Sequence, residues 1–231
     1  HILGTGQLSL AKFLFITAGT PAHVHTRNIS QFFQFVLERI DLERDLHFYT
    51  QTTIDTLDYS GTDLNSGSKL VVAASGEEKR KLGTDIPDWL TRCKGIEGAK
   101  MVMPGVVAFQ TDSYTDESST QQWIEHATDI WVQQGHSNTD IPLLIWCDDA
   151  GFTSQTLRNF CWVSFTRCNP SHDIHGIDAF VRHKHYGCRG PLVIDARIKP
   201  HHAPAVEMDP VIERRIEKLF AKGGSLHRLY S

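Results

Sequence analysis

Two segments of this chain look like copies of one structural unit. Each copy begins with an apolar run, 13–17 in the first and 143–147 in the second, and continues into a segment that fits a helix. Past that segment, three residue types recur at one constant offset: Arg39, Asp45 and His47, then Arg167, Asp173 and His175. A Gly followed by an apolar run comes later in both copies. An internal repeat constrains the architecture before local propensities do, because each copy must fold in the same way.

The pattern within each copy predicts alternating strands and a helix. In the first copy, 12–17 reads as a buried strand, a helix follows a cap at Asn28 or Ser30, and apolar runs at 46–49 and 70–74 read as strands. The second copy has matching runs around a helix over 157–165, and a closing strand over 191–196. We therefore expect an α/β fold with two related β-α-β units, mixed, largely parallel sheets and a C-terminal amphipathic helix.

The stretch between the copies has its own elements. Lys79, Arg80 and Lys81 suggest a basic helical patch, and 101–109 reads as a single strand. A longer helix begins at Ser118 or Ser119 and stops at Gly135. We expect four parts: a first unit over 1–76, a connecting α/β insert over 77–140, a second unit over 141–200, and an extended arm with a terminal helix over 201–231.

The terminal helix is the clearest single element. Asp209 is a good N-cap, and Pro210 fits the first helical position. An apolar stripe at helical spacing follows, made of Val211, Ile212, Ile216, Leu219 and Phe220. Such a stripe has to be buried, either on the chain's own second unit or on a neighbouring subunit. We favour the neighbouring subunit and expect a homo-oligomer.

Composition excludes several classes of partner. The formal net charge of −4 is spread along the chain, which argues against a nucleic-acid partner because that needs a basic patch. The apolar run over 11–18 is short and contains Lys12, so we expect no transmembrane segment. Five cysteines without regular spacing indicate reduced thiols, and no secretory leader precedes the first strand; both favour the cytoplasm. Because the chain starts at His1 and not at Met, we expect a fragment whose site is completed elsewhere.

Single motifs do not reveal a catalytic centre. His183 and His185 would share one face of a strand and suit a metal pair, but a His-rich polar loop is the favoured interpretation. Asp148 and Asp149 end a strand, where α/β proteins place functional residues, yet capping the next helix is more common. The repeated Arg and Asp, Arg39 with Asp45 and Arg167 with Asp173, indicate structural ion pairs or caps. We assign no catalytic residue and no metal ligand.

Taken in order, the motifs resemble a known family. The second copy has a strand ending in Asp148, a helix carrying Trp162, and then the pattern Thr-Arg-x-x-Pro-x-x-Asp over 166–173 and Ile-Asp-Ala-Arg-x-Lys over 194–199. The first copy has Gln-Leu-Ser-Leu-Ala-Lys over 7–12, Asp-Thr-Leu-Asp-Tyr over 55–59 and Gly-Ser-Lys over 67–69. This order is similar to the C-terminal part of the UbiD-type decarboxylases, and it covers most of the chain except about 77–140.

The resemblance implies a decarboxylase, a carboxy-lyase acting on an aromatic acid in ubiquinone or menaquinone biosynthesis. Members use prenylated FMN, a flavin that provides an electron sink, together with manganese and potassium. The family's catalytic residues and most cofactor contacts lie in its N-terminal domain, which would be this chain's partner. The isolated chain is then expected to be inactive. If the substrate carries a polyprenyl chain, the protein would be cytoplasmic but peripheral to the membrane.

The same resemblance suggests site residues by position. The family approaches the flavin phosphate at the segment that corresponds to Gln7, Ser9 and Lys12, and it approaches the substrate at Thr53, Asp55 and Leu57. A lysine beside an anionic phosphate is chemically sensible, although Lys12 could equally lie at the strand entrance in contact with water. The first copy has Thr-Ala-Gly at 17–19 in place of the acidic pair, so the copies are not equivalent. The alternative function is a stand-alone, non-catalytic assembly or binding subunit.

Overall fold

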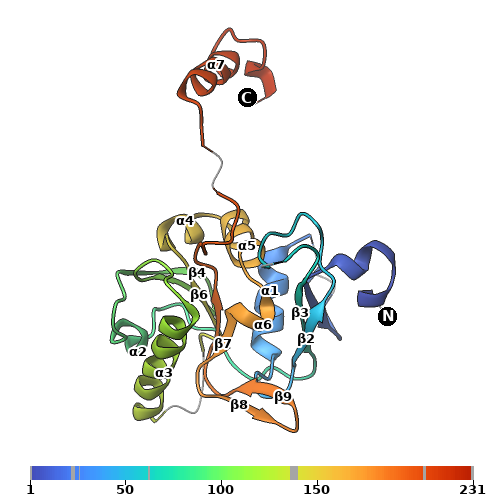
Figure 1. Ribbon diagram of the computed structural model, residues 1–231, viewed down its shortest axis with the longest axis vertical. Helices are drawn as coiled ribbons and strands as arrows, with labels where there is room; N and C mark the ends of the chain where they lie inside the picture. Colours follow the sequence, from blue (N-terminus) through green and yellow to red (C-terminus); the bar gives the residue numbers. More distant parts are fainter. Residues whose placement is uncertain are drawn as a thin grey trace.

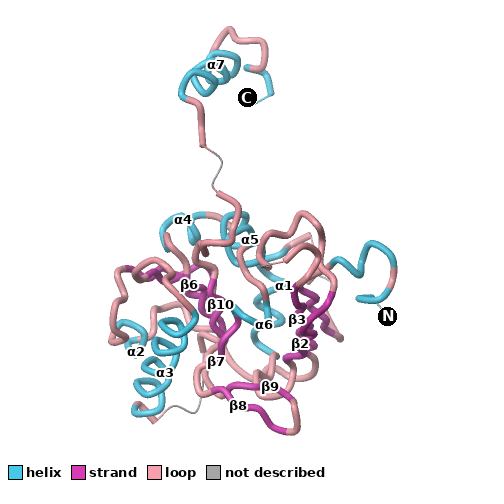
Figure 2. Tube along the Cα trace, in the orientation of Figure 1, coloured by secondary structure: helices cyan, strands magenta, loops and turns pink. Residues whose placement is uncertain are grey.

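The computed structural model describes residues 2–21, 24–25, 27–61, 63–135, 140–204 and 207–229. Figure 1 shows a compact body of strands and helices, with the C-terminal helix held away from it on an extended arm. The elements form a mixed α/β fold, as the sequence predicts. In the tube view, the strands form separate sheets within the body, with helices between and around them (Figure 2).

The first unit builds a three-stranded sheet in the order β1-β3-β2. Strand β1 (Phe13–Thr17) runs parallel to β3 (Gly67–Ala74), and β2 (Leu46–Thr52) runs antiparallel on the other side of β3. Between β1 and β2 lies α1 (Ile29–Arg39), whose Asn28 cap accepts a hydrogen bond from the Gln31 amide at 3.2 Å. The first β-α-β crossover is therefore present.

The second unit repeats this arrangement strand for strand. Strand β6 (Leu143–Trp146) runs parallel to β10 (Leu192–Asp195), and β7 (Ile174–Gly176) runs antiparallel on the far side of β10. His47 of β2 pairs with Val71, and His175 of β7 pairs with Val193, so the repeat also keeps the register. The internal repeat seen in the sequence is thus a repeat of topology.

Two more strands extend the second sheet to five, in the order β4-β5-β6-β10-β7. The single strand expected over 101–109 is wrong: β4 (Gly98–Met103) and β5 (Val106–Gln110) form an antiparallel hairpin. Pro104 and Gly105 make its turn, and Gly105 has a φ of 82°, which glycine adopts without strain. Strand β5 then runs parallel to β6. The predicted division of the chain into four parts stays a prediction.

The basic helix expected at Lys79 to Lys81 is also wrong, because this segment has no regular secondary structure. The Arg80 guanidinium donates hydrogen bonds to the carbonyl oxygens of Leu37 at 2.6 Å and Ile40 at 2.8 Å. These carbonyls lie at the C-terminal end of α1, where a helix has no partners of its own for them. A tertiary contact to a helix end therefore decides the conformation of this segment.

The remaining helices surround the second sheet. They are α2 (Asp88–Thr91), α3 (Glu117–Gln133), α4 (Ala150–Gln155), α5 (Leu157–Thr166) and α6 (Pro170–Asp173). The predicted start of α3 at Ser118 or Ser119 is slightly wrong, because Asp116 is its N-cap and accepts from the Ser119 amide at 2.7 Å. The hairpin of β8 (Ala179–Arg182) and β9 (His185–Cys188) lies below them in Figure 1.

One hydrophobic core joins the two units. Phe33 of α1 stacks on Phe165 of the second unit, with ring centroids 5.9 Å apart, and meets Phe160 edge-on at 5.7 Å. Phe15 of β1 also reaches Phe165. The cluster around them includes buried residues of both units, from Val36 to Ile194. A second cluster lies between α3 and the opposite face of the five-stranded sheet. The two units are therefore packed together through apolar side chains.

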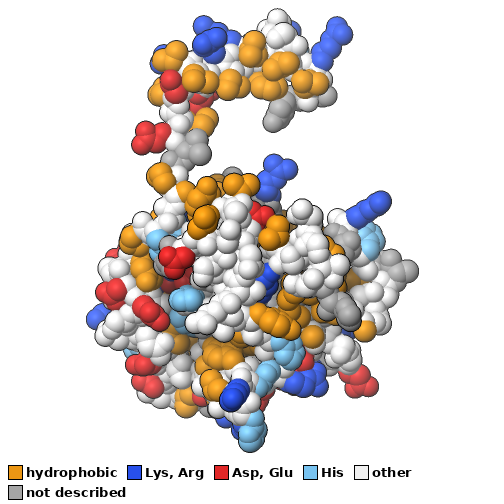
Figure 3. All heavy atoms as spheres, turned by 45° about the vertical axis from the view of Figure 1, so that its right-hand side comes forward, with side chains coloured by type: hydrophobic (Ala, Val, Ile, Leu, Met, Phe, Trp, Pro, Cys, Tyr) orange, Lys and Arg blue, Asp and Glu red, His pale blue; other side chains and the backbone are white. Residues whose placement is uncertain are grey.

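The terminal helix α7 (Pro210–Phe220) forms as predicted and does not dock on the body of the chain. Asp209 caps it, accepting from the Val211 amide at 2.8 Å. None of its described residues is buried, and Ile216 remains 46% exposed. Figure 3 shows its hydrophobic side chains open to water, well apart from the body. Docking of the stripe on the chain's own second unit is therefore wrong for this chain alone. Among the described residues, no helix has both the length and the apolar character needed to cross a bilayer.

Candidate functional site

A cavity lies where the two units meet, and we call it the seam cavity. It has a volume of about 770 Å³. The first unit contributes Lys12, Asp55, Leu57, Asp58 and Tyr59, while the second contributes Trp162, Phe165, Thr166 and Arg167. The start of the C-terminal arm closes it with Ile198, His202, Ala203 and Pro204. Both repeat units are needed to form this cavity, because neither supplies all of its walls.

Lys12 is the buried cation on the first unit's side. Its side chain is only 9% exposed, and its ammonium lies 2.7 Å from Asp58 Oδ2. It also donates to Ser60 Oγ at 2.9 Å, while Ser60 in turn donates from Oγ to Asp58 at 2.6 Å. Burial raises the pKa of Asp58, but the hydrogen bonds from Lys12 and Ser60 outweigh it and leave that pKa below its ordinary value. Lys12 and Asp58 therefore form an ion pair at neutral pH.

Arg167 is the cation on the second unit's side. Its Nη1 lies 3.2 Å from Asp148 Oδ2, and its guanidinium group stacks over the Trp162 ring at 5.0 Å. Asp148 also accepts from the Ile198 amide at 2.9 Å, which ties the start of the arm to the end of β6. The expected ion pair of Arg167 with Asp173 is wrong, because Arg167 pairs with Asp148. The expected ion pair of Arg39 with Asp45 is also wrong, because Arg39 pairs with Glu38. Contacts between distant segments override the repeat here.

The repeated aspartates are caps, as one of the two predictions had it. Asp45 accepts from the Asp41 amide at 2.8 Å, and Asp173 accepts from the Asn169 amide at 2.6 Å. Both bonds span four residues, so the two copies share this local motif. Asp149 likewise caps α4, accepting from the Phe152 amide at 2.8 Å. These carboxylates hold the backbone and are not free for chemistry.

The structure brings together only some of the predicted site residues. Lys12, Asp55 and Leu57 all line the seam cavity. Gln7 and Ser9 lie on the short 3₁₀ helix η2 (Gly6–Leu10), outside the cavity lining, and the Ser9 hydroxyl donates to the Gly6 carbonyl at 2.7 Å. Thr53 is exposed in the loop after β2 and does not line the cavity. The assigned roles of these residues stay predictions.

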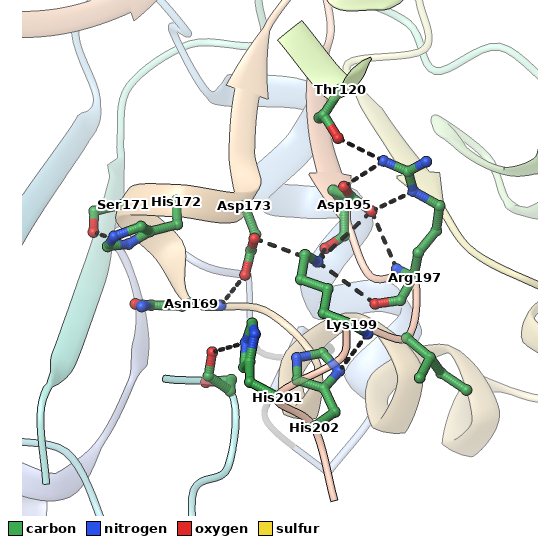
Figure 4. Close-up of polar contacts among 12 residues, drawn as sticks. Thr120, Asn169, Ser171, His172, Asp173, Asp195, Arg197, Lys199, His201 and His202 are labelled. Atoms are coloured by element: carbon green, nitrogen blue, oxygen red, sulfur yellow. Dashed lines mark hydrogen bonds and ion pairs between the residues drawn. The ribbon is translucent and has the colours of Figure 1, made fainter. Parts of the chain in front are cut away.

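Sequence reasoning missed a second, smaller cavity of about 200 Å³, which is lined mainly by polar residues. Figure 4 shows the buried network beside it. Arg197 donates to both oxygens of Asp195, at 2.9 and 2.7 Å, and its other edge reaches Thr120 at 2.8 Å. The Lys199 ammonium lies 3.3 Å from Asp173 Oδ1 and donates to the Asp195 carbonyl at 2.9 Å. The alternation of Asp, Arg and Lys over 195–199 is the sequence feature that could have predicted this network.

Burial shifts the acid–base properties of this network. Burial raises the pKa of Asp173 even though Lys199 opposes the shift. For Asp195, burial also raises the pKa, but the hydrogen bond from Arg197 outweighs it and leaves the pKa below its ordinary value. Burial lowers the pKa of His175, which lines the same cavity. The network is held together by its two cations, so its stability depends on both.

The possible histidine metal pair does not form. His183 and Lys184 have φ values of 51° and 67°, which place them at the turn of the β8–β9 hairpin instead of on one strand. Within the described part of the chain, no group of three or more His, Cys, Asp or Glu side chains could hold a metal ion. His183 therefore lies in a polar turn and not on a strand face with His185.

Comparisons with known proteins show which proteins this chain is similar to. Residues 1–74 match the family described as the 3-octaprenyl-4-hydroxybenzoate carboxy-lyase C-terminal domain, UbiD_C. A 4-hydroxybenzoate decarboxylase subunit of Chlamydia pneumoniae is 32% identical over 223 residues, which cover 94% of this chain and 35% of that protein. Residues 1–74 are thus similar to the UbiD-type C-terminal domain. The resemblance seen in the sequence is thereby confirmed.

The matched UbiD-type domain corresponds to the first repeat unit, from the N-terminal 3₁₀ helices to the end of β3. An uncharacterised protein of Chlamydia trachomatis is 31% identical over 222 residues, which cover 94% of this chain and 34% of that protein. The chain therefore spans about a third of the length of these curated relatives. Among solved structures, the vanillic acid decarboxylase of Sedimentibacter hydroxybenzoicus in its open form matches with a TM-score of 0.35 and 13% identity, over 74% of this chain and 44% of that one.

Proposed function

We propose that this chain is the C-terminal part of a UbiD-type aromatic acid decarboxylase in quinone biosynthesis, where it completes the flavin and substrate site and supports oligomerisation. The reaction replaces a carboxylate on an aromatic ring by a proton and releases CO₂. The observation that carries the proposal is the seam cavity, which gathers Lys12, Asp55 and Leu57 in one place. The 32% identity to a 4-hydroxybenzoate decarboxylase subunit supports the reaction class.

The residues of the cavity suit one end of a prenylated FMN. Lys12 uses its ammonium protons on Asp58 and Ser60, and one proton remains for a phosphate oxygen. The cavity has the size of sites that hold cofactors, and its apolar walls suit a ring system. When bound, prenylated FMN supplies an electron sink for the breaking carbon–carbon bond. Manganese and potassium find no matching ligand cluster among the described residues, so we assign them no role on this chain.

This chain's own residues would position and shield the reacting groups. We assign Lys12 to the cofactor phosphate, with Gln7 and Ser9 approaching it from η2, and place Asp55 and Leu57 toward the substrate, with Thr53 at the start of the same loop. Lys12, Asp58 and Arg167 line the seam cavity and are each engaged in an ion pair, so we assign none of them to proton transfer. The acid–base residues then belong to a catalytic domain outside this chain. We expect the isolated chain to release no CO₂.

The assembly role rests on α7. Its apolar stripe stays uncovered in the single chain, and each such side chain gains roughly 1.5–3 kcal/mol when it is buried. A second copy or the catalytic domain would provide that burial, which also fits the alternative of a non-catalytic assembly subunit. We place the protein in the cytoplasm, at the membrane surface if its substrate carries a polyprenyl chain.

The decisive experiment uses the longer protein that contains this chain. Flavin occupancy is measured from absorbance after purification, and CO₂ release is measured with a panel of hydroxyaryl acids. Lys12→Ala removes a charge-assisted contact that contributes about 1.5–3 kcal/mol, so flavin occupancy should fall. Lys100→Ala, at an exposed position on β4, is the matched control and should change nothing. Absence of CO₂ release from the longer, flavin-loaded protein would leave the assembly subunit as the better function.

A further inference from the structure

Arg167 lines the seam cavity on the second unit's side, as Lys12 does on the first unit's side. We propose that Arg167, from the second repeat unit, holds an oxyanion of the ligand together with Lys12, while Trp162 and Phe165 receive the ligand's planar apolar body. The inference rests on the proposed function, which identifies the seam cavity as the ligand site. It adds a specificity-determining contact from the second repeat unit. The ligand class is a carboxylate or phosphate attached to an aromatic ring system.

The guanidinium of Arg167 has unused hydrogen-bonding capacity. Arginine carries five N–H donors in a planar fork. Among the described residues, only Nη1 of Arg167 has a partner, Asp148, and the side chain is 20% exposed where it lines the cavity. The planar fork matches the two oxygens of a carboxylate or phosphate. Arg197, by contrast, is buried, and its side chain donates three hydrogen bonds to Asp195 and Thr120.

The carboxylates near the two cations have their own partners. Asp58 accepts from Lys12 and from both the amide and hydroxyl of Ser60. Asp148 accepts from Arg167 and from the Ile198 amide. These bonds fix the cations in place and partly neutralise the carboxylates. Asp55 also lines the cavity and accepts from the Leu57 amide at 2.8 Å. The N–H donors of Lys12 and Arg167 that have no partner among the described residues remain for an oxyanion.

The wall beside Arg167 is aromatic and uncovered. Trp162 is 50% exposed, with Arg167 stacked over its ring and Phe152 at its edge, 6.3 Å between centroids. Phe165 lines the cavity floor as part of the shared aromatic core. Figure 3 shows hydrophobic side chains gathered on the body where the arm leaves it. A planar ligand on this wall would cover apolar surface and place its anionic group beside the guanidinium.

Histidine does not supply the charge in this cavity. His202 lines it, but burial, reinforced by the charge of Lys199 and then by His201, Arg167 and Lys12, lowers its pKa to about 4. The ring is therefore neutral at pH 7. Its Nδ1 accepts from the Lys199 amide at 3.2 Å, which holds the ring in place. Of the residues that line the seam cavity, Lys12 and Arg167 are thus the ones that carry positive charge at neutral pH.

The test is ligand binding to the full 231-residue chain, measured by isothermal titration calorimetry at pH 7. The probes are FMN against riboflavin, which lacks the phosphate, and 4-hydroxybenzoate against 4-hydroxybenzyl alcohol, which lacks the carboxylate. The probe pair with the larger difference in affinity shows whether the oxyanion is a phosphate or a carboxylate. Arg167→Leu should weaken binding of the anionic probe roughly 10- to 100-fold and leave its neutral analogue unchanged. Arg167→Lys, which keeps the charge but loses the fork, should fall between.

Two control variants separate ligand binding from a structural role. Asp148→Asn removes the ion pair but keeps the guanidinium, so anion binding should hold or tighten; a structural ion pair would instead make this variant as weak as Arg167→Leu. Arg189→Leu breaks an exposed ion pair with Asp178 on the β8–β9 side of the molecule and should have no effect. Equal binding of anionic and neutral probes, no binding of any probe, or unchanged binding in Arg167→Leu would each overturn the inference.

The proposed function can fail separately. Oxyanion binding lost in Arg167→Leu, with no CO₂ released by the longer protein, would remove the decarboxylase and keep the two-cation site. Decarboxylation by the longer protein, with unchanged oxyanion binding in Arg167→Leu, would support the decarboxylase and remove the two-cation site.

Discussion

Removing the Lys199 ammonium should destabilise the fold far more than an average substitution. Its side chain is 3% exposed, and it lies 3.3 Å from Asp173 and 3.8 Å from Asp195. Asp195 keeps Arg197 as a partner, so Lys199→Met leaves chiefly Asp173 as a buried carboxylate without a counter-ion. Breaking one side of a buried ion pair costs about 3–5 kcal/mol. For a chain of this length, that corresponds to a fall in melting temperature of roughly 6–20 °C.

The loss of stability in Lys199→Met should depend on pH. Burial already raises the pKa of Asp173 above its ordinary value, and loss of Lys199 raises it further. A carboxyl with a raised pKa in the folded state binds more protons there than in the unfolded state, so its contribution favours folding at low pH and is lost as pH rises through the folded pKa. The difference in unfolding free energy between the parent and Lys199→Met should therefore shrink from pH 7 to pH 5.

The assay is urea unfolding at both pH values, with Asp173→Asn added as a second change. The double variant Lys199→Met with Asp173→Asn has no unpaired charge and should recover part of the loss. Asp45→Asn is the matched control, because Asp45 has the same capping role in the first unit but pairs with the exposed Arg44. It should cost only about 1 kcal/mol. A loss below about 1 kcal/mol for Lys199→Met, or a double variant no more stable than the single one, would refute the reasoning.

Three further predictions follow from single features of the fold. Gly105→Ala should cost more than the roughly 1–2 kcal/mol of a left-handed alanine, because its Cβ would meet the Leu82 side chain at 2.7 Å. No atom of the described residues lies within 4 Å of a Cβ at Gly135, so Gly135→Ala should cost only that amount; equal losses in thermal unfolding would contradict this. His202, with a pKa of about 4, binds fewer protons in the folded chain than in the unfolded chain, so it lowers the free energy of unfolding as pH falls from about 6.5 through 4. His202→Asn should flatten the plot of unfolding free energy against pH over that range, and an unchanged slope would contradict the prediction. Truncation after Pro204, followed by light scattering, should turn an oligomeric parent into a folded monomer, and an oligomer of unchanged size would rule out α7 as the interface.

The sequence determined what depends on neighbouring residues. The caps at Asn28, Asp149 and Asp209 were predictable, because each bonds to an amide two or three residues along the chain. The repeat predicted two related units, and the strand order β1-β3-β2 recurs as β6-β10-β7. The constant spacing of Asp45 and Asp173 likewise reflects a local bond within each copy.

Only the tertiary structure decided which distant residues meet. Arg167 pairs with Asp148 instead of Asp173, which is nearer in the sequence, and Arg80 lies on the end of α1 instead of starting a helix. Both guanidinium groups are partly buried, and such donors pair with the acceptors that the packed chain brings close. Lys12 and Arg167 line one cavity because apolar side chains of both units pack into a shared core. No local pattern encodes that packing, since its driving force acts on the apolar surface of the whole chain and has no direction along the sequence.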